Sequence, residues 1–354
     1  MKILTVIGAR PQFIKAAALS RRVYDYKGIS EKIIHTGQHY DSNMSSIFFD
    51  ELDIPKPDYN LNIGGGSHGE MTGRQLEAIE KILLKEGPDL VLVYGDTNST
   101  LAGALAAAKL HIKVAHIEAG LRSYNRVMPE EINRVLTDHV SDILFAPSKL
   151  AEKNLIREGT QKESIYMVGD IMKDTSLFYE NFAKEPKFIN EIKISEDGFV
   201  LATIHRAENT DSKINLSNII SGLASSGLTV ILPLHPRTQK KITEYNIKLP
   251  ENIHISDPVG YLEMIWLEKN CLLIATDSGG VQKEAYFHGK KCVTMRSETE
   301  WVELVNDGWN VLTDTNVERI SEAIKDRSKL PESTDIYGNG DTANKILNII
   351  SNII

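Results

Sequence analysis

The sequence is poor in cysteine, with only Cys271 and Cys292 among its 354 residues. Each lies inside an apolar run typical of a strand, and two cysteines at this separation match neither a zinc-ligand spacing nor a disulfide framework. We therefore expect two buried thiols and no metal site.

An excess of positive charge and long apolar runs are also missing. The 40 basic residues are outnumbered by 48 acidic ones, which gives a formal net charge of −8 and disfavours nucleic-acid binding, although it permits a local phosphate pocket. No apolar run approaches the roughly 18 residues of a membrane helix. Residues 1–7 predict a buried strand, not a signal peptide. We expect a cytoplasmic protein with neither a membrane nor a nucleic-acid partner.

What the sequence does contain is an alternation of short β-branched apolar runs with amphipathic or alanine-rich stretches. The predicted strands are residues 3–7, 32–35, 90–94, 114–117, 143–146, 165–168, 199–203, 229–232, 272–275 and 292–295. The predicted helices include residues 11–22, 71–84, 97–110, 149–158, 214–224, 262–268, 280–288 and 317–324. Repeated β-α-β units predict parallel sheets with helices on both faces.

The alternation is interrupted once, by the charged segment 170–198. Because the length suits two cores, we predict two Rossmann-like α/β domains with a cleft between them, residues 1–169 and 170–337. A helix over 338–354 is expected to pack back on the first domain. Ligands of doubly wound sheets lie outside the carboxyl ends of the strands, so the residues after each strand are the candidates for a site.

The first strand is followed by Gly-Ala-Arg-Pro-Gln, residues 8–12. Proline suits a first helical turn, and a helix N-terminus favours anions. Arg10 and Lys15 add positive charge there, so phosphate binding is favoured over a plain turn with a solvated arginine. The segment is not GxGxxG, which argues against a dinucleotide clamp.

Three carboxylates follow in the first half: Asp96 and Glu118 after predicted strands, and Glu130 at the start of a predicted helix. Each has a structural alternative, since Asp96 could cap a helix and Glu130 could complement a helix dipole. A glutamate at the exit of a buried strand is rarely placed for packing. Clustered carboxylates shift one another's pKa, so that one acts as acid and another as base.

The second half offers histidines and a glycine-rich helix start. His205-Arg206 follows one strand and His235 the next, which suits acid–base work with charge stabilisation, although a lone histidine is more often structural. Ser278-Gly279-Gly280 opens a helix with bare N–H groups and a hydroxyl, which suits a diphosphate better than an ordinary capped turn. Glu284, one turn later, is placed to reach a ribose diol.

Six segments together resemble the non-hydrolysing UDP-N-acetylglucosamine 2-epimerases, over nearly the whole chain and in the family's order. They are residues 8–15, 95–97, 116–122, 129–134, 205–209 and 277–284. The resemblance implies a GT-B-type fold, a homodimer, a UDP-linked amino sugar as substrate and no cofactor. It also implies a reaction in which a base removes the C2 proton while UDP leaves C1, after which a proton reaches C2 from the opposite face and UDP re-adds.

The resemblance assigns roles to these candidates. Asp96, Glu118, Glu130 and His205 are implied to be the acid–base residues. Arg10, Lys15, Arg206, His235, Ser278, Gly279, Gly280 and Glu284 form the substrate-binding set.

Three departures from the family pattern bear on the substrate: Gln12 where many members have glutamate, Trp301 where many have arginine, and a longer segment over residues 38–44. These features resemble the branch that acts on UDP-2,3-diacetamido-2,3-dideoxyglucuronate. The last departure argues against activation by a second substrate molecule.

The expected reaction converts UDP-GlcNAc to UDP-ManNAc, or the diacetamido-glucuronate to its manno epimer, as a supply of surface polysaccharide precursors. The alternatives are a GT-B glycosyltransferase that uses a UDP-sugar donor, an inactive nucleotide-sugar binder and a hydrolysing epimerase.

Overall fold

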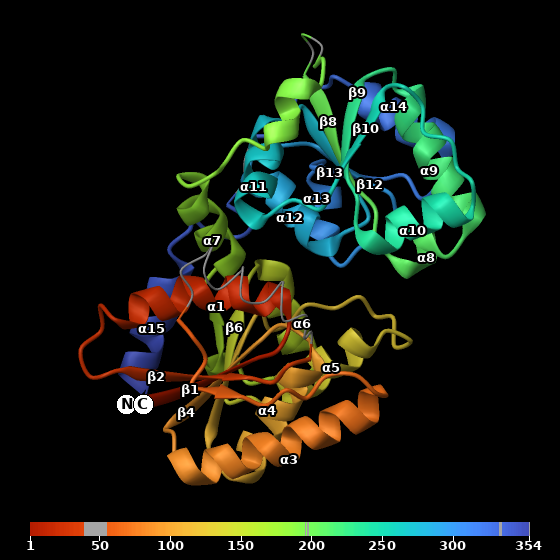
Figure 1. Ribbon diagram of the computed structural model, residues 1–354. Helices are drawn as coiled ribbons and strands as arrows, with labels where there is room; N and C mark the ends of the chain where they lie inside the picture. The colour runs from red at the N-terminus through yellow and green to blue at the C-terminus, as the bar shows by residue number, and fades with distance from the viewer. Residues whose placement is uncertain (39–54, 195, 197, 333–334, 354) are drawn as a thin grey trace. The chain divides into compact units, whose positions relative to one another are not determined.

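The computed structural model describes residues 1–38, 55–194, 196, 198–332 and 335–353. The chain divides into two compact units (Figure 1). Unit 1 comprises Met1–Thr175 and Asp335–Ile354, and unit 2 comprises Ser176–Thr334. The domain limits expected from the sequence stay a prediction.

Unit 1 alternates strands and helices along the chain. Its strands are β1 (Lys2–Ile7), β2 (Ser30–His35), β3 (Tyr59–Asn60), β4 (Leu90–Tyr94), β5 (Lys113–Ile117), β6 (Ile143–Ala146) and β7 (Ile165–Met167). Its helices are α1 (Arg10–Val23), α3 (His68–Glu86), α4 (Asn98–Lys109), α5 (Pro129–Val140), α6 (Lys149–Arg157) and α15 (Thr342–Ile353), with a 3₁₀ turn at Lys162–Ser164. Helix α7 (Ile171–Glu180) contains the division between the units.

Unit 2 repeats the pattern. Its strands are β8 (Phe199–Thr203), β9 (Thr229–Pro233), β10 (Ile253–Ser256), β11 (Leu273–Thr276), β12 (Cys292–Thr294) and β13 (Asn310–Leu312). Its helices are α8 (Ala207–Thr210), α9 (Lys213–Ser225), α10 (Pro236–Glu244), α11 (Tyr261–Asn270), α12 (Gly279–Phe287), α13 (Val302–Asn306) and α14 (Val317–Lys325), with a 3₁₀ turn at Lys187–Glu191.

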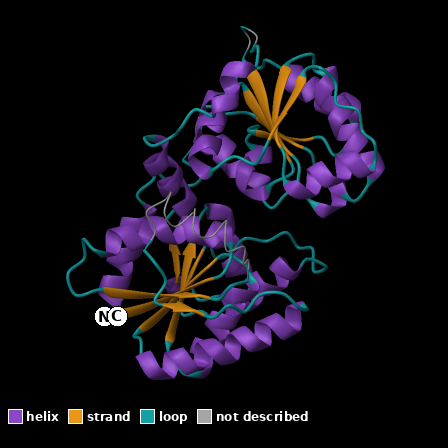
Figure 2. Ribbon diagram, viewed as in Figure 1, coloured by secondary structure: helices purple, strands orange, loops and turns teal. Residues whose placement is uncertain are grey.

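Both sheets are parallel and doubly wound. The strand order is β3-β2-β1-β4-β5-β6-β7 in unit 1 and β10-β9-β8-β11-β12-β13 in unit 2. Helices cover both faces of each sheet (Figure 2). The order reverses between β1 and β4 and between β8 and β11, and ligands of such folds bind at that switch point. The prediction of two Rossmann-like α/β halves is confirmed.

The cores follow from strand alternation, since successive side chains point to opposite faces of a sheet. In β8, Val200 and Ala202 pack into one apolar cluster with residues of α9 and α14. Phe199 and Leu201 pack into a second cluster, with Leu267 of α11 among others. Because both faces of the sheet are buried, the side chains of β8 are apolar on both faces over residues 199–202, as in other parallel sheets.

The C-terminal segment joins unit 1, where α15 packs against α1. The hydroxyl of Tyr26 donates to Asn348 Oδ1 at 3.1 Å, and the Ala343 amide donates to Asp174 Oδ1 at 2.9 Å. Gly169 has φ of 99° and a Cβ there would lie 2.8 Å from the Tyr337 carbonyl oxygen, so only glycine fits this close approach.

None of the helices in the described ranges combines the length and the apolar composition that crossing a bilayer requires.

Candidate active site

The turn after β1 is held by Gln12. Its Oε1 accepts from the Gly8 and Ala9 amides at 2.8 and 3.0 Å, and its Nε2 donates to the Tyr94 carbonyl at 2.8 Å and to Thr100 Oγ1 at 2.9 Å. The side chain therefore ties the β1–α1 turn to the end of β4, across the switch point. An ionised glutamate at this position has no side-chain N–H groups, so it could not donate to the Tyr94 carbonyl or to Thr100.

The cationic candidates of this turn lie on α1. The helix begins at Arg10, whose side chain lies outside the described structure. Lys15, one turn later, places Nζ against Oε2 of Glu118, and the two side chains are only 11% and 9% exposed. A Cβ on Gly95 would lie 3.5 Å from Lys15 Nζ and 4.0 Å from Glu118 Oε2. The pair therefore lies directly beside the turn that carries Asp96.

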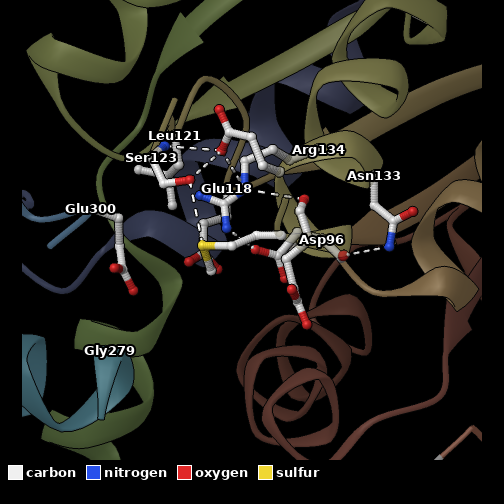
Figure 3. A network of polar contacts seen from close by, with 12 residues as sticks. Asp96, Glu118, Leu121, Ser123, Asn133, Arg134, Gly279 and Glu300 are labelled. Carbon is white, nitrogen blue, oxygen red and sulfur yellow. Dashed lines mark hydrogen bonds and ion pairs between the residues drawn. The ribbon is translucent and has the colours of Figure 1, made fainter. Parts of the chain in front are cut away.

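Asp96 faces a second cation, as Figure 3 shows. Its Oδ2 accepts from Arg134 Nη2 at 2.5 Å, and Asn133 Nδ2 donates to its carbonyl oxygen at 3.0 Å (Figure 3). The helix-cap alternative for Asp96 is wrong, because Thr97 is the N-cap of α4 and accepts from the Thr100 amide. Asp96 therefore has no capping role, and its carboxylate pairs with the side chain of Arg134.

Burial raises the pKa of Asp96 above its ordinary value of 3.8. Arg134 opposes this shift, and the Glu118 charge adds to it. Glu130 acts on Asp96 in the same direction as Glu118, through its charge. The structure therefore brings Lys15, Asp96 and Glu118 together, and Glu130 lies close enough for its charge to affect the pKa of Asp96.

Glu118 occupies an uncommon backbone conformation, with φ of 74°. Non-glycine residues rarely adopt this left-handed region, and such strain concentrates at functional sites. Its amide and that of Ala119 both donate to the Phe145 carbonyl, at 3.2 and 3.1 Å. The conformation is therefore imposed by the neighbouring strand β6.

The two glutamates at the start of α5 have different surroundings. Glu130 is exposed. Glu131 is 1% exposed and accepts from the amides of Ser123 and Tyr124, both at 2.9 Å, so it anchors the loop after β5. Of the two neighbouring glutamates, Glu131 thus has a structural role in holding this loop, while Glu130 is left accessible.

In unit 2 the segment that carries His205 and Arg206 is held by Asp277, which is fully buried. Its Oδ1 lies 3.3 Å from His205 Nδ1, and its carboxylate accepts from the amides of His205 and Arg206 at 3.1 Å and from Asn209 Nδ2 at 3.0 Å. Asp277 follows β11 and the others follow β8, so this carboxylate links the two segments on either side of the switch point of the second sheet. The His205 side chain remains 41% exposed.

His235 lies near His205, with ring centroids 6.2 Å apart. Its Nδ1 accepts from the Arg237 amide at 3.2 Å, which makes it the N-cap of α10. His235 is exposed, and the structure gives it a capping function beside any role in binding.

The Ser278-Gly279-Gly280 segment forms the first turn of α12. Ser278 is the N-cap. A Cβ on Gly279 would lie 2.2 Å from Oε1 of Glu300, so a larger residue there would have to displace that carboxylate. Around Gly280 the nearest atom to such a Cβ is Ser278 Oγ at 3.9 Å, which leaves its backbone approachable. Glycine at that position suits a ligand that contacts the main chain.

Charged and aromatic groups frame this turn. Glu300 lies 3.0 Å from Arg296 Nη1 and 3.9 Å from Arg206 Nη2. Trp301, 3% exposed, donates from Nε1 to the Gly279 carbonyl at 2.8 Å, and Lys283 Nζ lies 4.3 Å from the centroid of its ring. The indole thus anchors this turn. Glu284 lies half-buried on the same helix.

Several of these groups escaped prediction from the sequence, namely Gln12, Arg134, Asp277 and Glu131. All four lie inside segments 8–15, 129–134 and 277–284, which carry the family resemblance. Residues 39–44 of the segment that departs from the family lie outside the described residues. Among the described residues, no group of three histidine, cysteine or acidic side chains is arranged to hold a metal ion.

Comparison with known proteins supports the same family. The family model described as UDP-N-acetylglucosamine 2-epimerase matches residues 21–351. UDP-2,3-diacetamido-2,3-dideoxy-D-glucuronate 2-epimerase of Pseudomonas aeruginosa is 53% identical over 360 residues, covering 100% of both chains. The UDP-N-acetylglucosamine 2-epimerase homolog of Methanococcus maripaludis is 54% identical, also covering 100% of both.

A solved structure shares the fold as well. The UDP-GlcNAc 2-epimerase of Methanocaldococcus jannaschii, in complex with UDP-GlcNAc and UDP, is 46% identical, with a TM-score of 0.89 over 99% of this chain and 100% of the other. The family expected from the sequence motifs is confirmed. The chain belongs to the UDP-N-acetylglucosamine 2-epimerase family, and it is an isomerase, either a UDP-N-acetylglucosamine 2-epimerase or a close variant.

Proposed function

We propose that this protein inverts C2 of a UDP-linked N-acetylated amino sugar by elimination and re-addition of UDP. The observation that supports this most is the pairing of two carboxylates with two cations around one turn. Asp96 pairs with Arg134 and Glu118 with Lys15, both beside Gly95. Proton removal from C2 and proton return to the opposite face need two such groups held in different surroundings.

The proposed reaction balances as follows. A base takes the C2 proton, the electron pair of that C–H bond forms the C1–C2 double bond, and the C1–O bond to UDP breaks. An acid then delivers a proton to the other face of C2, and UDP attacks C1. Asp96, Glu118, Glu130 and His205 are the proposed proton carriers. The raised pKa of Asp96 supports a carboxyl group that both gains and loses a proton during the cycle.

Unit 2 is proposed to hold the nucleotide. The first turn of α12 presents amide groups at a helix N-terminus, which attract a diphosphate. Ser278, Gly279 and Gly280 supply this turn, Arg206 adds charge, and Glu284 and His235 complete the proposed contacts. Arg10 is proposed to contact the diphosphate from α1. This clamp would stabilise UDP first as leaving group and then as nucleophile.

For the substrate we propose UDP-2,3-diacetamido-2,3-dideoxyglucuronate. The full-length identity to the Pseudomonas aeruginosa enzyme and the tryptophan at position 301 support this choice. UDP-GlcNAc is the second candidate, because the Methanocaldococcus jannaschii enzyme that binds it is 46% identical. Comparing kcat/KM for the two sugars decides between them.

We also propose a cytoplasmic homodimer, on the basis of the family resemblance. Light scattering of the purified protein at micromolar concentration measures the mass directly. A monomer of 39.5 kDa would contradict the proposal.

The acid–base assignment is tested with Asp96→Asn, Glu118→Gln and Glu130→Gln. We expect kcat to fall by about 10²–10⁴-fold, while the Kd for UDP, measured by calorimetry, changes little. Glu77→Gln is the matched control, because Glu77 is an exposed carboxylate of α3. Near-native rates in all three variants would refute the assignment.

The glycosyltransferase alternative is tested separately. Product formation without an added acceptor excludes it.

A further inference from the structure

A buried charge network lies behind the two candidate carboxylates. His116 on β5 and Asp138 on α5 are fully buried, and His116 Nδ1 lies 2.7 Å from Asp138 Oδ1. His116 Nε2 lies 2.7 Å from the carbonyl oxygen of Gly95. Both ring nitrogens of His116 therefore face oxygen acceptors.

This geometry determines where protons must be. A backbone carbonyl has no proton to donate, so Nε2 must carry one. An ionised carboxylate also only accepts, so Nδ1 must carry one as well. We propose that His116 is held as an imidazolium by Asp138 and serves as the positioning residue of the Gly95–Asp96 turn.

The remaining partners of Asp138 favour its ionised form. Its Oδ2 accepts from Arg122 Nη1 at 2.7 Å and from the Gly120 amide at 3.1 Å. Burial by itself would raise the pKa of Asp138, but its contacts with His116 and Arg122 outweigh burial and lower that pKa. The proton shared by the pair is thus expected on the imidazole.

Charge balance leads to the same result. Arg122 also forms a bidentate pair with Glu158, at 2.8 and 2.6 Å, and Glu158 is the C-cap of α6. With His116 charged, two cations face two carboxylates. With His116 neutral, Arg122 alone would face the two carboxylates. One negative charge would then be uncompensated in a buried site, which is costly.

The network reaches both sides of the candidate site. Through His116 it holds Gly95, which has φ of 62° and precedes Asp96. Through the Gly120 amide it holds the backbone two residues after Glu118. Loss of the His116–Asp138 pair should therefore disturb the placement of both carboxylates, without removing any group that contacts the substrate.

The charge state is tested by nitrogen NMR of the full-length protein labelled with ¹⁵N-histidine. His116→Gln identifies the His116 signals by their loss. We expect both ring nitrogens to be protonated at neutral pH. One unprotonated ring nitrogen would overturn the proposal. This measurement needs neither substrate nor turnover.

The positioning role, which rests on the proposed function, is tested with Asp138→Asn. We expect kcat to fall by about 10–100-fold, as for other supporting contacts, with KM nearly unchanged, and His116 to become neutral in the same NMR experiment. Asp142→Asn is the matched control. Asp142 lies just after α5 and accepts from the Val114 amide at 2.8 Å, at the opposite end of β5. An unchanged kcat in Asp138→Asn would refute the positioning role. If that variant does not fold, the wild-type NMR result still decides the charge state.

Discussion

The ammonium group of Lys15 contacts the carboxylate of Glu118, which lies 103 residues later in the chain. Lys15 belongs to α1 and Glu118 follows β5, and both side chains are nearly buried. A pair of this kind is weak evidence for stability, because desolvation of the charges offsets much of their attraction. Its position beside the Gly95–Asp96 turn fits the role in proton transfer proposed for Glu118.

Breaking this pair from one side should be costly. We expect Lys15→Met to lower the free energy of unfolding by about 3 kcal/mol, because it leaves Glu118 buried without its cation. The double variant Lys15→Met/Glu118→Gln should lose less than the sum of the single changes. Urea unfolding of the four proteins measures the coupling.

The control for that cycle is Lys81→Met, which breaks the exposed pair with Glu77. Exposed pairs of this kind contribute about 0.5 kcal/mol or less. Additive losses in the Lys15 and Glu118 variants would show that their contact contributes nothing to the folded state.

Arg134 should control the pH dependence through Asp96. Burial raises the pKa of Asp96, and Arg134 holds it down by stabilising the carboxylate. If Asp96 must be ionised in the free enzyme, Arg134→Gln should move the acidic limb of the kcat/KM profile to higher pH, and Arg134→Lys should move it less. A loss of rate with an unmoved limb would contradict a titrating role for Asp96.

Much of the fold and of the candidate site could be predicted because both depend on local pattern. Strand β4 was expected at residues 90–94 and is found at Leu90–Tyr94. Parallel strands bring their carboxyl ends to one edge, so residues as distant as Lys15 and Glu118 could be expected in one region.

What could not be predicted depends on short elements and on partners. Strand β13 has three residues and α7 lies in a charged stretch, so neither stands out by periodicity. The capping role fell to Thr97 because its hydroxyl, not the Asp96 carboxylate, lies at the helix start. The partners of Arg134 and Asp277 follow only from the fold, since contacts between segments far apart in the chain have no signature in sequence.

Trp301 should be needed for the first turn of α12. We expect Trp301→Arg to lower the melting temperature and to weaken UDP binding, because it removes a buried ring and the hydrogen bond to Gly279. Trp301→Phe keeps an aromatic ring for Lys283 but loses the N–H donor and part of the buried ring, and the lost hydrogen bond alone should cost about 1 kcal/mol. Calorimetric UDP titration and thermal unfolding measure both effects. Wild-type UDP affinity in Trp301→Arg would show that the indole has no part in the clamp.

Both cysteines should be inert in the native protein. Burial raises the pKa of the Cys271 and Cys292 thiols to about 12, and the thiolate is the reactive form. We expect no alkylation by iodoacetamide at pH 8 until the chain unfolds, followed by modification of both residues in guanidinium chloride. Rapid labelling of either thiol in the folded enzyme, read by mass spectrometry, would contradict their burial.

The most direct test of the central claim is proton NMR of the reaction in D₂O. The enzyme is incubated separately with UDP-2,3-diacetamido-2,3-dideoxyglucuronate and with UDP-GlcNAc, and no acceptor is added. Elimination and re-addition predict loss of the C2 proton signal and a new manno-type anomeric signal that is still coupled to phosphorus. Retention of the C2 proton with both sugars, or release of free sugar and UDP, would contradict the account.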